Sequence, residues 1–323
     1  MDLAIITVSY NTRDLLVDCL ASVLDSLERS GLEAELWVVD NASADGSAEL
    51  VRQRFPAVRL IAHDQNVGFA AGNNLALRQM GFSVPTSSSR NAAGPDDLPR
   101  HVLFLNPDTR VLGDAPSRMV RFLDQVPGAG AVGAQLVHGD GSFQHSAFAF
   151  PGLAQVLIDF FPLHTRLIDS RLNGRYPRSL YDKGAPFLVD HPLGAALMVC
   201  SEVLAQVGGF DERFFMYCEE IDLCRRIRAA GWEIYCLPQA RIVHLVGQST
   251  QQFRDRMFVE LWRSRYLMFD KHNGPPFRWL VRRLVCLGLW AEARRARAAH
   301  RRGAITSEEL EGRLQAFHQV AQL

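Results

Sequence analysis

Short apolar runs alternate with amphipathic segments over the first part of this 323-residue chain. Four of the runs are short, apolar and rich in branched side chains, which predicts β-strands at 3–10, 35–40, 58–63 and 101–106. Helical patterns separate them, the first from about residue 12 to residue 29. Because strands that alternate with helices form largely parallel sheets, we predict an α/β fold in which helices flank a Rossmann-like, mostly parallel mixed sheet.

After these four strands the regular alternation of strand and helix patterns ends. Residues 150–190 show no regular periodicity, and GAALMVC at 194–200 predicts a buried strand. A helix that begins near Glu219 follows, then two strands, WEIYCLP and ARIVHL, and then a helix over about 252–271. The sequence therefore predicts a first domain that spans residues 1–272.

Two segments differ from the rest of the chain. Residues 83–100 are rich in Ser, Pro, Asn and Asp and lack apolar periodicity, which predicts a mobile surface loop. Residues 273–323 predict a basic, amphipathic helical tail. Its segment 275–302 carries eight Arg and one Glu, and its apolar surface includes Trp279 and Trp290. This helix is too short and too charged to span a membrane. Contact with a membrane surface, packing on the main domain and packing on a second copy as a homodimer are all open interpretations.

Composition narrows the classes of partner. The chain has 35 basic and 35 acidic residues, so it offers no general attraction to nucleic acid. Its first residues combine an acidic second position with a short apolar run, which favours a strand over a signal peptide and predicts a cytoplasmic protein, with peripheral contact on the inner face of the plasma membrane through the tail. The six Cys form no CxxC pair, so we expect buried, reduced thiols and no zinc site.

The stretch HVLFLNPDT at 101–109 is the most informative feature for chemistry. It places Asp108 just beyond the end of a buried strand, which is where open α/β sheets bind ligands. A hard divalent cation such as Mg²⁺ or Mn²⁺ prefers oxygen ligands and completes its shell with water and substrate phosphates, so Asp108 is the leading metal ligand. His244 ends another predicted strand and is either a second ligand or a structural histidine.

A second candidate lies at the end of the strand ELWVVD. Asp40 is followed there by a polar turn, and its carboxylate could accept the imide N–H of uracil or thymine. The alternative is that it only caps the next helix. Four polar residues at the end of the first strand favour the binding interpretation, because they would lie beside Asp40 in a parallel sheet: Thr7, Ser9, Tyr10 and Asn11.

The third candidate is the acidic cluster in YCEEIDLCRRIRAAGW. At about 100° per residue, Glu220 falls on the apolar side of this helix, whereas Glu219 and Asp222 lie toward its margins. Burial raises the pKa of a carboxyl group, which suits a general base, although the helix amino terminus acts in the opposite direction. Acidic decoration of a helix start would give the same pattern.

The glycine pattern argues against dinucleotide chemistry. A Rossmann cofactor site needs GxGxxG after the first strand, and the chain has TVSYNTRD there instead. The nearest glycines, Gly68 and Gly72 in NVGFAAGNN, follow the third strand. The same absence of a glycine-rich loop disfavours an oxidoreductase and a nucleotidyltransferase.

Six co-linear motifs carry a family resemblance: TVSYN, VVDNASADGS, NVGFAAGNN, FLNPDT, GGFDERFFMYCEEIDLCRR and GWEIYCLPQARIVHLVGQST. Together they resemble the family 2 glycosyltransferases, and more closely the bacterial rhamnosyltransferase-like branch, over roughly residues 3–252. The resemblance implies a GT-A fold, a nucleotide-diphosphate sugar donor carrying uridine or thymidine, a divalent cation and inversion at the anomeric carbon. It tilts the donor sugar toward rhamnose. The basic, apolar tail favours a glycan or polyprenyl-linked acceptor at the inner face of the membrane, in cell-surface polysaccharide synthesis.

The resemblance also implies residue roles. Asp40 matches the base-recognising aspartate, Asp108 the metal-binding aspartate of the DXD motif, and His244 a histidine that joins the metal shell in some members. Glu220 matches the catalytic base. The implied nucleotide site comprises Thr7, Ser9, Tyr10, Asn11, Asp40, Asn66, Gly72, Asn73 and Asn106, and the implied acceptor side comprises Gly194, Ala195, Phe210 and Asp211.

Two departures from the family pattern leave roles open. Asn106 replaces the first aspartate of DXD, which favours contact with ribose or a metal-bound water over direct metal binding. Glu220 replaces an aspartate and is longer by one methylene, so Glu219 and Asp222 remain alternatives for the base. A catalytically silent protein of the same fold, which binds a nucleotide sugar or serves as a scaffold, is the alternative to an active transferase.

Overall fold

The computed structural model describes residues 1–83, 98–161, 164–245 and 254–323. The chain divides into two compact units, of which the first comprises residues 1–148, 177–215 and 219–249 and the second residues 149–176, 216–218 and 250–323. The predicted loop at 83–100 lies almost wholly outside the described residues. The predicted domain boundary at residue 272 stays a prediction.

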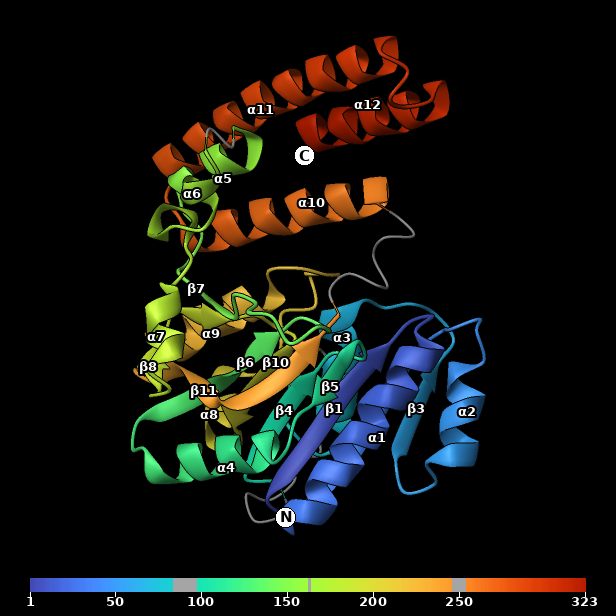
Figure 1. The fold of residues 1–323 in the computed structure, drawn as a ribbon, viewed down its shortest axis with the longest axis vertical. Coiled ribbons are helices and arrows are strands. Elements are labelled where there is room, and N and C mark those ends of the chain that lie inside the picture. The colour runs from blue at the N-terminus through green and yellow to red at the C-terminus, as the bar shows by residue number, and fades with distance from the viewer. Residues whose placement is uncertain (84–97, 162–163, 246–253) are drawn as a thin grey trace. The chain divides into compact units, whose positions relative to one another are not determined.

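The first unit is built on a nine-stranded mixed sheet (Figure 1). Neighbouring strands follow the order β3-β2-β1-β4-β10-β6-β11-β5, and β8 (Phe187–Leu188) pairs with β11. The first four strands of this order are parallel, and β10 is antiparallel to both of its neighbours. The strands are β3 (Arg59–His63), β2 (Ala34–Asn41), β1 (Leu3–Ser9), β4 (His101–Leu105), β10 (Ala196–Cys200), β6 (Ala129–Val137), β11 (Glu233–His244) and β5 (Thr109–Val111).

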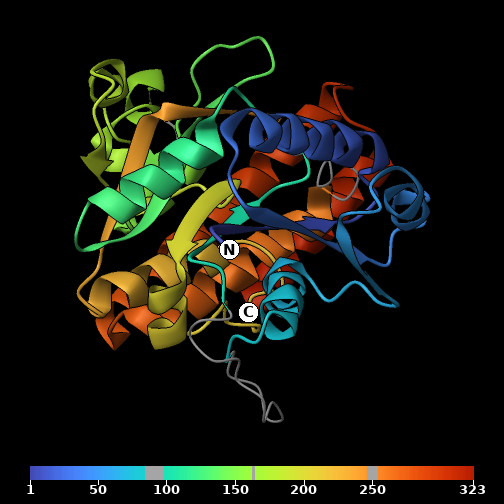
Figure 2. The ribbon, with the colours of Figure 1, turned by 90° about the horizontal axis from the view of Figure 1, so that it is seen from below.

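Helices cover both faces of this sheet (Figure 2). One face carries α1 (Arg13–Ser30), α2 (Ser47–Arg54) and α4 (Ala115–Gln125), and the other carries α3 (Phe69–Gln79), α8 (Ser201–Val207) and α9 (Glu219–Ala229). Residues of β1 alternate between the two layers: Leu3 and Ile5 join the core beneath α1, whereas Val8 faces Gly72 of α3. Burial on both faces explains why the central strands are continuous apolar runs.

The predicted α/β fold is confirmed, with two local differences. The predicted strands WEIYCLP and ARIVHL form one strand, β11, whose pairing with β6 shifts register between Leu237 and Arg241. Pro238, which has no N–H to donate to a ladder, lies in this irregular stretch. Residues 150–190 are more ordered than predicted, because four short helices form there: α5 (Leu153–Phe160), α6 (Thr165–Ile168), η2 (Arg171–Asn173) and α7 (Arg178–Asp182).

The second unit contains three long helices, α10 (Arg254–His272), α11 (Pro275–Arg301) and α12 (Ser307–Gln322), together with α5, α6 and η2. Helices α11 and α12 form a helical hairpin (Figure 1), and α11 also contacts α5, where Gly288 lies against the ring of Phe160. The predicted capping box that begins α12 is confirmed, since Thr306 and Glu309 exchange side-chain to backbone hydrogen bonds.

The helices and the cysteines agree only in part with the sequence-based expectations. None of the described helices offers a stretch both long and apolar enough to cross a bilayer. No disulfide joins any of the six cysteines, and four of them are buried, but Cys286 on α11 is exposed. The expectation of uniformly buried thiols is therefore wrong for Cys286, because the side of α11 that bears it faces away from the neighbouring helices.

Candidate active site

The carboxyl ends of β1 and β2 place Asp40 beside Ser9, its register partner. Asp40 is buried, and its Oδ2 accepts a hydrogen bond from the backbone N–H of Ser43 at 3.0 Å. Its Oδ1 is also buried and has no hydrogen-bond partner in the part of the chain that the structure describes. A buried carboxylate oxygen without a partner is costly, so this atom is suited to accept a hydrogen bond from a ligand.

The loops that follow β1 and β2 are tied to each other. The Asn11 side chain accepts a hydrogen bond from the Ala44 N–H at 2.8 Å, and the Asn11 N–H donates to Oγ of Ser43 at 2.9 Å. Asn11 and Ala42 both adopt a left-handed backbone, with φ of 52° and 62°. Such conformations are uncommon outside glycine and cluster at functional sites, where the surrounding structure holds them.

The other polar residues predicted beside Asp40 lie at different depths in β1 and in the loop after it. Thr7 lies two residues inside β1 and is buried, and Oγ of Ser9 is 2.9 Å from Oγ1 of Thr12. Tyr10 and Asn11 follow the strand end. Their roles toward a nucleotide stay predictions.

The NVGFAAGNN motif forms the turn into α3 and packs closely on two other segments. Asn41 at the end of β2 donates to the Gly68 carbonyl at 3.0 Å, and the Asn66 side chain accepts from the Gly68 N–H at 3.0 Å. Gly68 has φ of 88°, and a Cβ there would lie 2.3 Å from the carbonyl oxygen of Phe215, so only glycine fits. Asn73, in the first turns of α3, keeps a buried Oδ1 without a hydrogen-bond partner among the described residues.

Asp108 and His244 lie together at the same edge of the sheet. Asp108 follows β4, His244 ends β11, and the Leu245 N–H donates to the Asp108 carbonyl at 3.0 Å. Nε2 of His244 is 3.5 Å from Oδ1 of Asp108. Burial lowers the pKa of His244, which favours the neutral imidazole that binds metal ions.

Gln144 orients the imidazole from the other side, and sequence reasoning missed this residue. Its side-chain amide is 3.3 Å from Nδ1 of His244, and its Oε1 is buried without a partner among the described residues. Nε2 of Gln144 is the amide atom that faces Nδ1, and a half-turn of the amide would present Oε1 in the same space. With Oε1 facing Nδ1, the histidine proton would reside on Nδ1 and Nε2 would be free to bind a cation.

A cation at this point would have few ligands from the protein. Within the described residues, no group of three or more His, Cys, Asp or Glu side chains could hold a metal ion. The separation of 3.5 Å between Nε2 of His244 and Oδ1 of Asp108 nevertheless suits two ligands of one cation, since neighbouring ligands at about 2.1 Å from an octahedral ion lie about 3 Å apart. This donor set fits a cation that takes its remaining ligands from water and phosphate oxygens.

The start of β10 connects this edge to the acidic helix α9. The Asn106 N–H donates to the Ala195 carbonyl at 2.9 Å, so the residue after β4 is joined to the residue before β10. A Cβ at Gly194 would lie 3.3 Å from Cγ of Glu220, which shows that the Glu220 side chain packs directly on this glycine. Contacts thus run from Glu220 through Gly194 and Ala195 to Asn106, two residues from Asp108.

All three acids in the first turn of α9 are buried, not Glu220 alone as the helical projection predicts. Oε2 of Glu219 and Oε2 of Glu220 are buried without hydrogen-bond partners among the described residues. Burial raises the pKa of Glu220 to about 7, against the opposing pull of the backbone N–H groups of Glu220 and Ile221. Burial, and then the charge of Glu220, raise the pKa of Glu219 well above its usual value.

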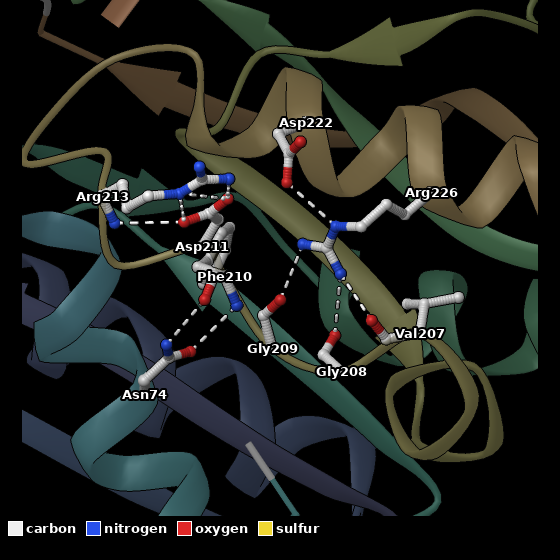
Figure 3. A network of polar contacts seen from close by, with 9 residues as sticks. All are labelled: Asn74, Val207, Gly208, Gly209, Phe210, Asp211, Arg213, Asp222 and Arg226. Carbon is white, nitrogen blue, oxygen red and sulfur yellow. Dashed lines mark hydrogen bonds and ion pairs between the residues drawn. The ribbon is translucent and has the colours of Figure 1, made fainter. Parts of the chain in front are cut away.

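Asp222 is engaged differently, as Figure 3 shows. Its Oδ2 accepts a hydrogen bond from Nε of Arg226, one turn later on α9, at 2.9 Å. The guanidinium of Arg226 also donates to the carbonyls of Val207 and Gly209, each at 2.7 Å. The pair Asp222–Arg226 therefore fixes the loop that leads from α8 toward Phe210 and Asp211.

Asn74 of α3 holds the same loop from its other side (Figure 3). Its fully buried amide donates to the Phe210 carbonyl at 2.8 Å and accepts from the Phe210 N–H at 2.9 Å, so both backbone groups are satisfied. The Phe210 ring packs edge-on against Phe104 of β4, with ring centroids 4.7 Å apart. Asp211 forms an ion pair with the exposed Arg213 at 2.7 Å.

Sequence reasoning also missed Asn74, Arg226 and Asn41. Arg226 follows Asp222 by four residues, a spacing that places two side chains on one side of a helix and could have indicated their pairing. Asn74 adjoins Asn73 in a motif already selected, but no local pattern indicates a partner 136 positions away.

The arrangement of sheet and helices has counterparts among solved structures. The mixed sheet with helices on both faces and a helical carboxyl-terminal region is the GT-A glycosyltransferase fold. One solved structure that shares it is mannosyltransferase PcManGT from Pyrobaculum calidifontis in complex with GDP-Man and Mn²⁺, at a TM-score of 0.53 and 18% identity, over 99% of this chain and 80% of that one.

Sequence comparisons show which family the chain resembles. Residues 4–82 match the model of glycosyl transferase family 2. The N-acetylglucosaminyl-diphospho-decaprenol L-rhamnosyltransferase of Mycobacterium tuberculosis (strain CDC 1551 / Oshkosh) is 29% identical, over 88% of this chain and 91% of that protein. Rhamnosyltransferase WbbL of Escherichia coli (strain K12) is 24% identical, over 68% of this chain and 72% of that one. The predicted resemblance to family 2 glycosyltransferases of the rhamnosyltransferase-like branch is confirmed.

We predict that Asn74→Ala destabilises the first unit. The variant leaves the buried N–H and C=O of Phe210 without partners, at about 1–3 kcal/mol for each group, so the free energy of unfolding should fall by about 2 kcal/mol or more. Denaturant unfolding measures the change. Gln79→Ala, at an exposed position on the same helix, is the matched control and should change stability little. Equal stability of the two variants would contradict the role of Asn74.

Proposed function

We propose that the chain transfers a sugar from a nucleotide-diphosphate donor to a hydroxyl group of a glycan or polyprenyl-linked acceptor, with inversion at the anomeric carbon. One observation carries this proposal. Asp40 and Glu220 each keep a buried carboxylate oxygen without a partner among the described residues, and the pair Asp108–His244 lies at the same edge of the sheet. The family resemblance and the names of the relatives support the reaction class.

Asp40 would select the base of the nucleotide. Its free Oδ1 can accept the imide N–H of uracil or thymine, whereas cytosine has no donor at that position. The tied loops after β1 and β2 would hold this oxygen in place before the donor binds, which lowers the ordering cost of recognition.

Asp108 and His244 would hold a divalent cation, with Gln144 setting the orientation of the imidazole. A bound Mg²⁺ or Mn²⁺ supplies the positive charge that stabilises a leaving diphosphate. Asn106 lies between these ligands and Ala195 in the chain of contacts, a position that suits contact with ribose or with a water of the ion.

Glu220 would act as the general base. Its carboxylate takes the proton from the acceptor hydroxyl, the hydroxyl oxygen forms a bond to C1 of the sugar, and the bond from C1 to the diphosphate oxygen breaks, so the configuration inverts. General-base catalysis raises a rate by about 10²- to 10⁴-fold, which lowers the activation free energy by roughly 3–5 kcal/mol. Asp222 is the weakest alternative for the base, because its carboxylate is paired with Arg226.

The names of two relatives support a proposal for the donor sugar and the acceptor. Two of them are named rhamnosyltransferases, and one name specifies an N-acetylglucosaminyl-diphospho-decaprenol acceptor. We therefore propose a rhamnose donor, carried by dTDP or UDP, and a polyprenyl-diphosphate-linked glycan acceptor in cell-surface polysaccharide synthesis. Gly194, Ala195, Phe210 and Asp211 would line the acceptor side.

A thermal-shift screen of nucleotide sugars tests the donor. With Mn²⁺ or Mg²⁺ present, dTDP-rhamnose or the UDP analogue should raise the melting temperature more than CMP-sugars, because cytosine has no ring N–H to donate to Asp40. The best donor should also be hydrolysed slowly or transferred to an acceptor. Stabilisation without any hydrolysis or transfer would instead favour the catalytically silent binding protein.

Glu220→Gln should bind donor and metal as the wild type does, and lose about 10²- to 10⁴-fold in kcat, because the amide cannot accept the proton. In the wild type, kcat/KM should rise with pH through about 7 and then level off, since burial raises the pKa of the base to about 7 and only its ionised form is active. The groups that face this carboxyl include Glu219 and Cys224, both also buried.

Two variants control this experiment. Glu202→Gln changes an exposed acid on α8 and should keep full activity. Glu219→Gln removes the neighbouring buried acid, and should keep most of the turnover with an altered pH profile. If Glu220→Gln transfers sugar at nearly the wild-type rate while Glu219→Gln does not, the base is Glu219 and the assignment to Glu220 is wrong.

Asp108→Ala should weaken cation-dependent donor binding. Removal of one carboxylate ligand leaves His244 as the protein's contact with the ion, so calorimetry with donor should show a loss of the affinity gained on adding Mn²⁺ or Mg²⁺. Asp114→Ala, at a half-buried acid just before α4 that pairs with Arg118, is the control. A cation effect of the same size in Asp108→Ala would refute the metal assignment.

A further inference from the structure

Helix α11 of the second unit has one buried side and one exposed side. Val281, Val285, Gly288 and Leu289 are buried against the rest of that unit. The opposite side exposes large apolar side chains: Trp279 at 60%, Trp290 at 57% and Leu287 at 53% of their maximum. Large apolar residues that are scattered singly need no explanation, but three on one side of a single helix form a patch.

The exposed residues follow a helical stripe. At about 100° per residue, positions 279, 283, 287, 290, 294 and 297 fall within a sector of roughly 80°. The arginines of this stripe are exposed as well, and we call the whole set the Trp–Arg face: Trp279, Arg283, Leu287, Trp290, Arg294 and Arg297. Cys286 lies beside it and is also exposed.

The Trp–Arg face carries only positive charge. No ion pair forms at Arg283, Arg294 or Arg297 within the described chain, and the single acid of α11, Glu292, pairs with Arg295 outside the face. Arg283 lies over the Trp279 ring at 5.5 Å, and Arg294 lies over the Trp290 ring at 4.8 Å. Each tryptophan is therefore exposed beside a guanidinium group that is free to meet an anion.

We propose that the Trp–Arg face binds the surface of an anionic bilayer, with α11 lying parallel to the membrane. Indole rings favour the boundary between headgroups and acyl chains, and guanidinium groups form paired hydrogen bonds with lipid phosphates. All peptide groups inside the helix are already hydrogen-bonded, so the helix can enter this layer without exposing backbone donors or acceptors. Its 27 residues give a contact about 40 Å long.

Charge complementarity favours lipid over a second copy of the chain. In a two-fold symmetric dimer the same face meets itself, so three unpaired arginines of one copy would lie opposite three of the other. The face itself holds no acid to offset this repulsion. An anionic membrane supplies that counter-charge, and each basic side chain near such a surface contributes favourably to binding.

Vesicle binding of the full chain tests the proposal without any substrate, so the result does not depend on whether the proposed sugar transfer is correct. Co-sedimentation is measured with phosphatidylcholine vesicles and with vesicles that also contain phosphatidylglycerol and cardiolipin. The wild type should bind the anionic vesicles, less tightly as salt rises, with a blue shift of tryptophan emission. The triple variant Arg283→Glu/Arg294→Glu/Arg297→Glu should bind at least about tenfold more weakly.

A matched variant separates local from overall charge. Arg171→Glu/Arg256→Glu/Arg263→Glu makes the same change of charge at exposed positions of the same unit outside α11, and should bind anionic vesicles nearly as well as the wild type. Trp279→Ala/Trp290→Ala should bind more weakly and lose most of the emission shift. Thermal unfolding checks that all variants fold.

Three results would overturn the proposal. One is equal vesicle binding by the two charge variants, and another is binding that does not depend on anionic lipid. The third is a wild-type dimer in light scattering that Trp279→Ala/Trp290→Ala dissociates, without vesicle binding by the wild type, which would assign the face to a second copy.

Discussion

Burial of the acids at the start of α9 is the constraint on which the candidate site depends. Three carboxylates enter one turn of helix, and a buried charge is tolerated only with a partner, a nearby dipole or a shift in pKa. Each solution occurs here: Asp222 pairs with Arg226, the helix amides oppose the shift at Glu220, and burial raises the pKa of both glutamates. Carboxyl groups with pKa values raised by burial cluster at functional sites, and the start of α9 is such a cluster.

The surroundings of these acids are correspondingly rigid. Arg226 and Asn74 hold the loop before α9 through its backbone groups, one from each side, and Gly194 leaves the space that the Glu220 side chain occupies. Hydrogen bonds to backbone groups fix position regardless of which side chains the loop carries. The loop could therefore vary its outward residues while the acids stay in place.

The sheet order explains why residues far apart in sequence share one edge. Strands β2, β1 and β4 are parallel neighbours, so the segments after them emerge together, and β11 brings His244 alongside Thr109, next to Asp108. Antiparallel β10 enters from this edge and begins beside Glu220. Ligands bind at the carboxyl ends of strands in such sheets because loops from several strands converge there.

Sequence by itself determined the four parallel strands of the sheet, the helices between them, the capping box of α12 and the positions of Asp40, Asp108, Glu220 and His244 at element ends, because periodicity and turn chemistry are local properties. It could not reveal Gln144 beside His244 or Asn74 beside Phe210, because these contacts join residues 100 and 136 positions apart. It could not reveal the exposed side of α11 either, because that depends on which side other helices cover. Only tertiary structure decided that β11 is one strand, that Asp222 is paired with Arg226, and that Oε2 of Glu219 and Oε2 of Glu220 have no hydrogen-bond partner among the described residues. The burial and pairing of a side chain depend on how distant segments pack against it, and no local sequence pattern determines that packing.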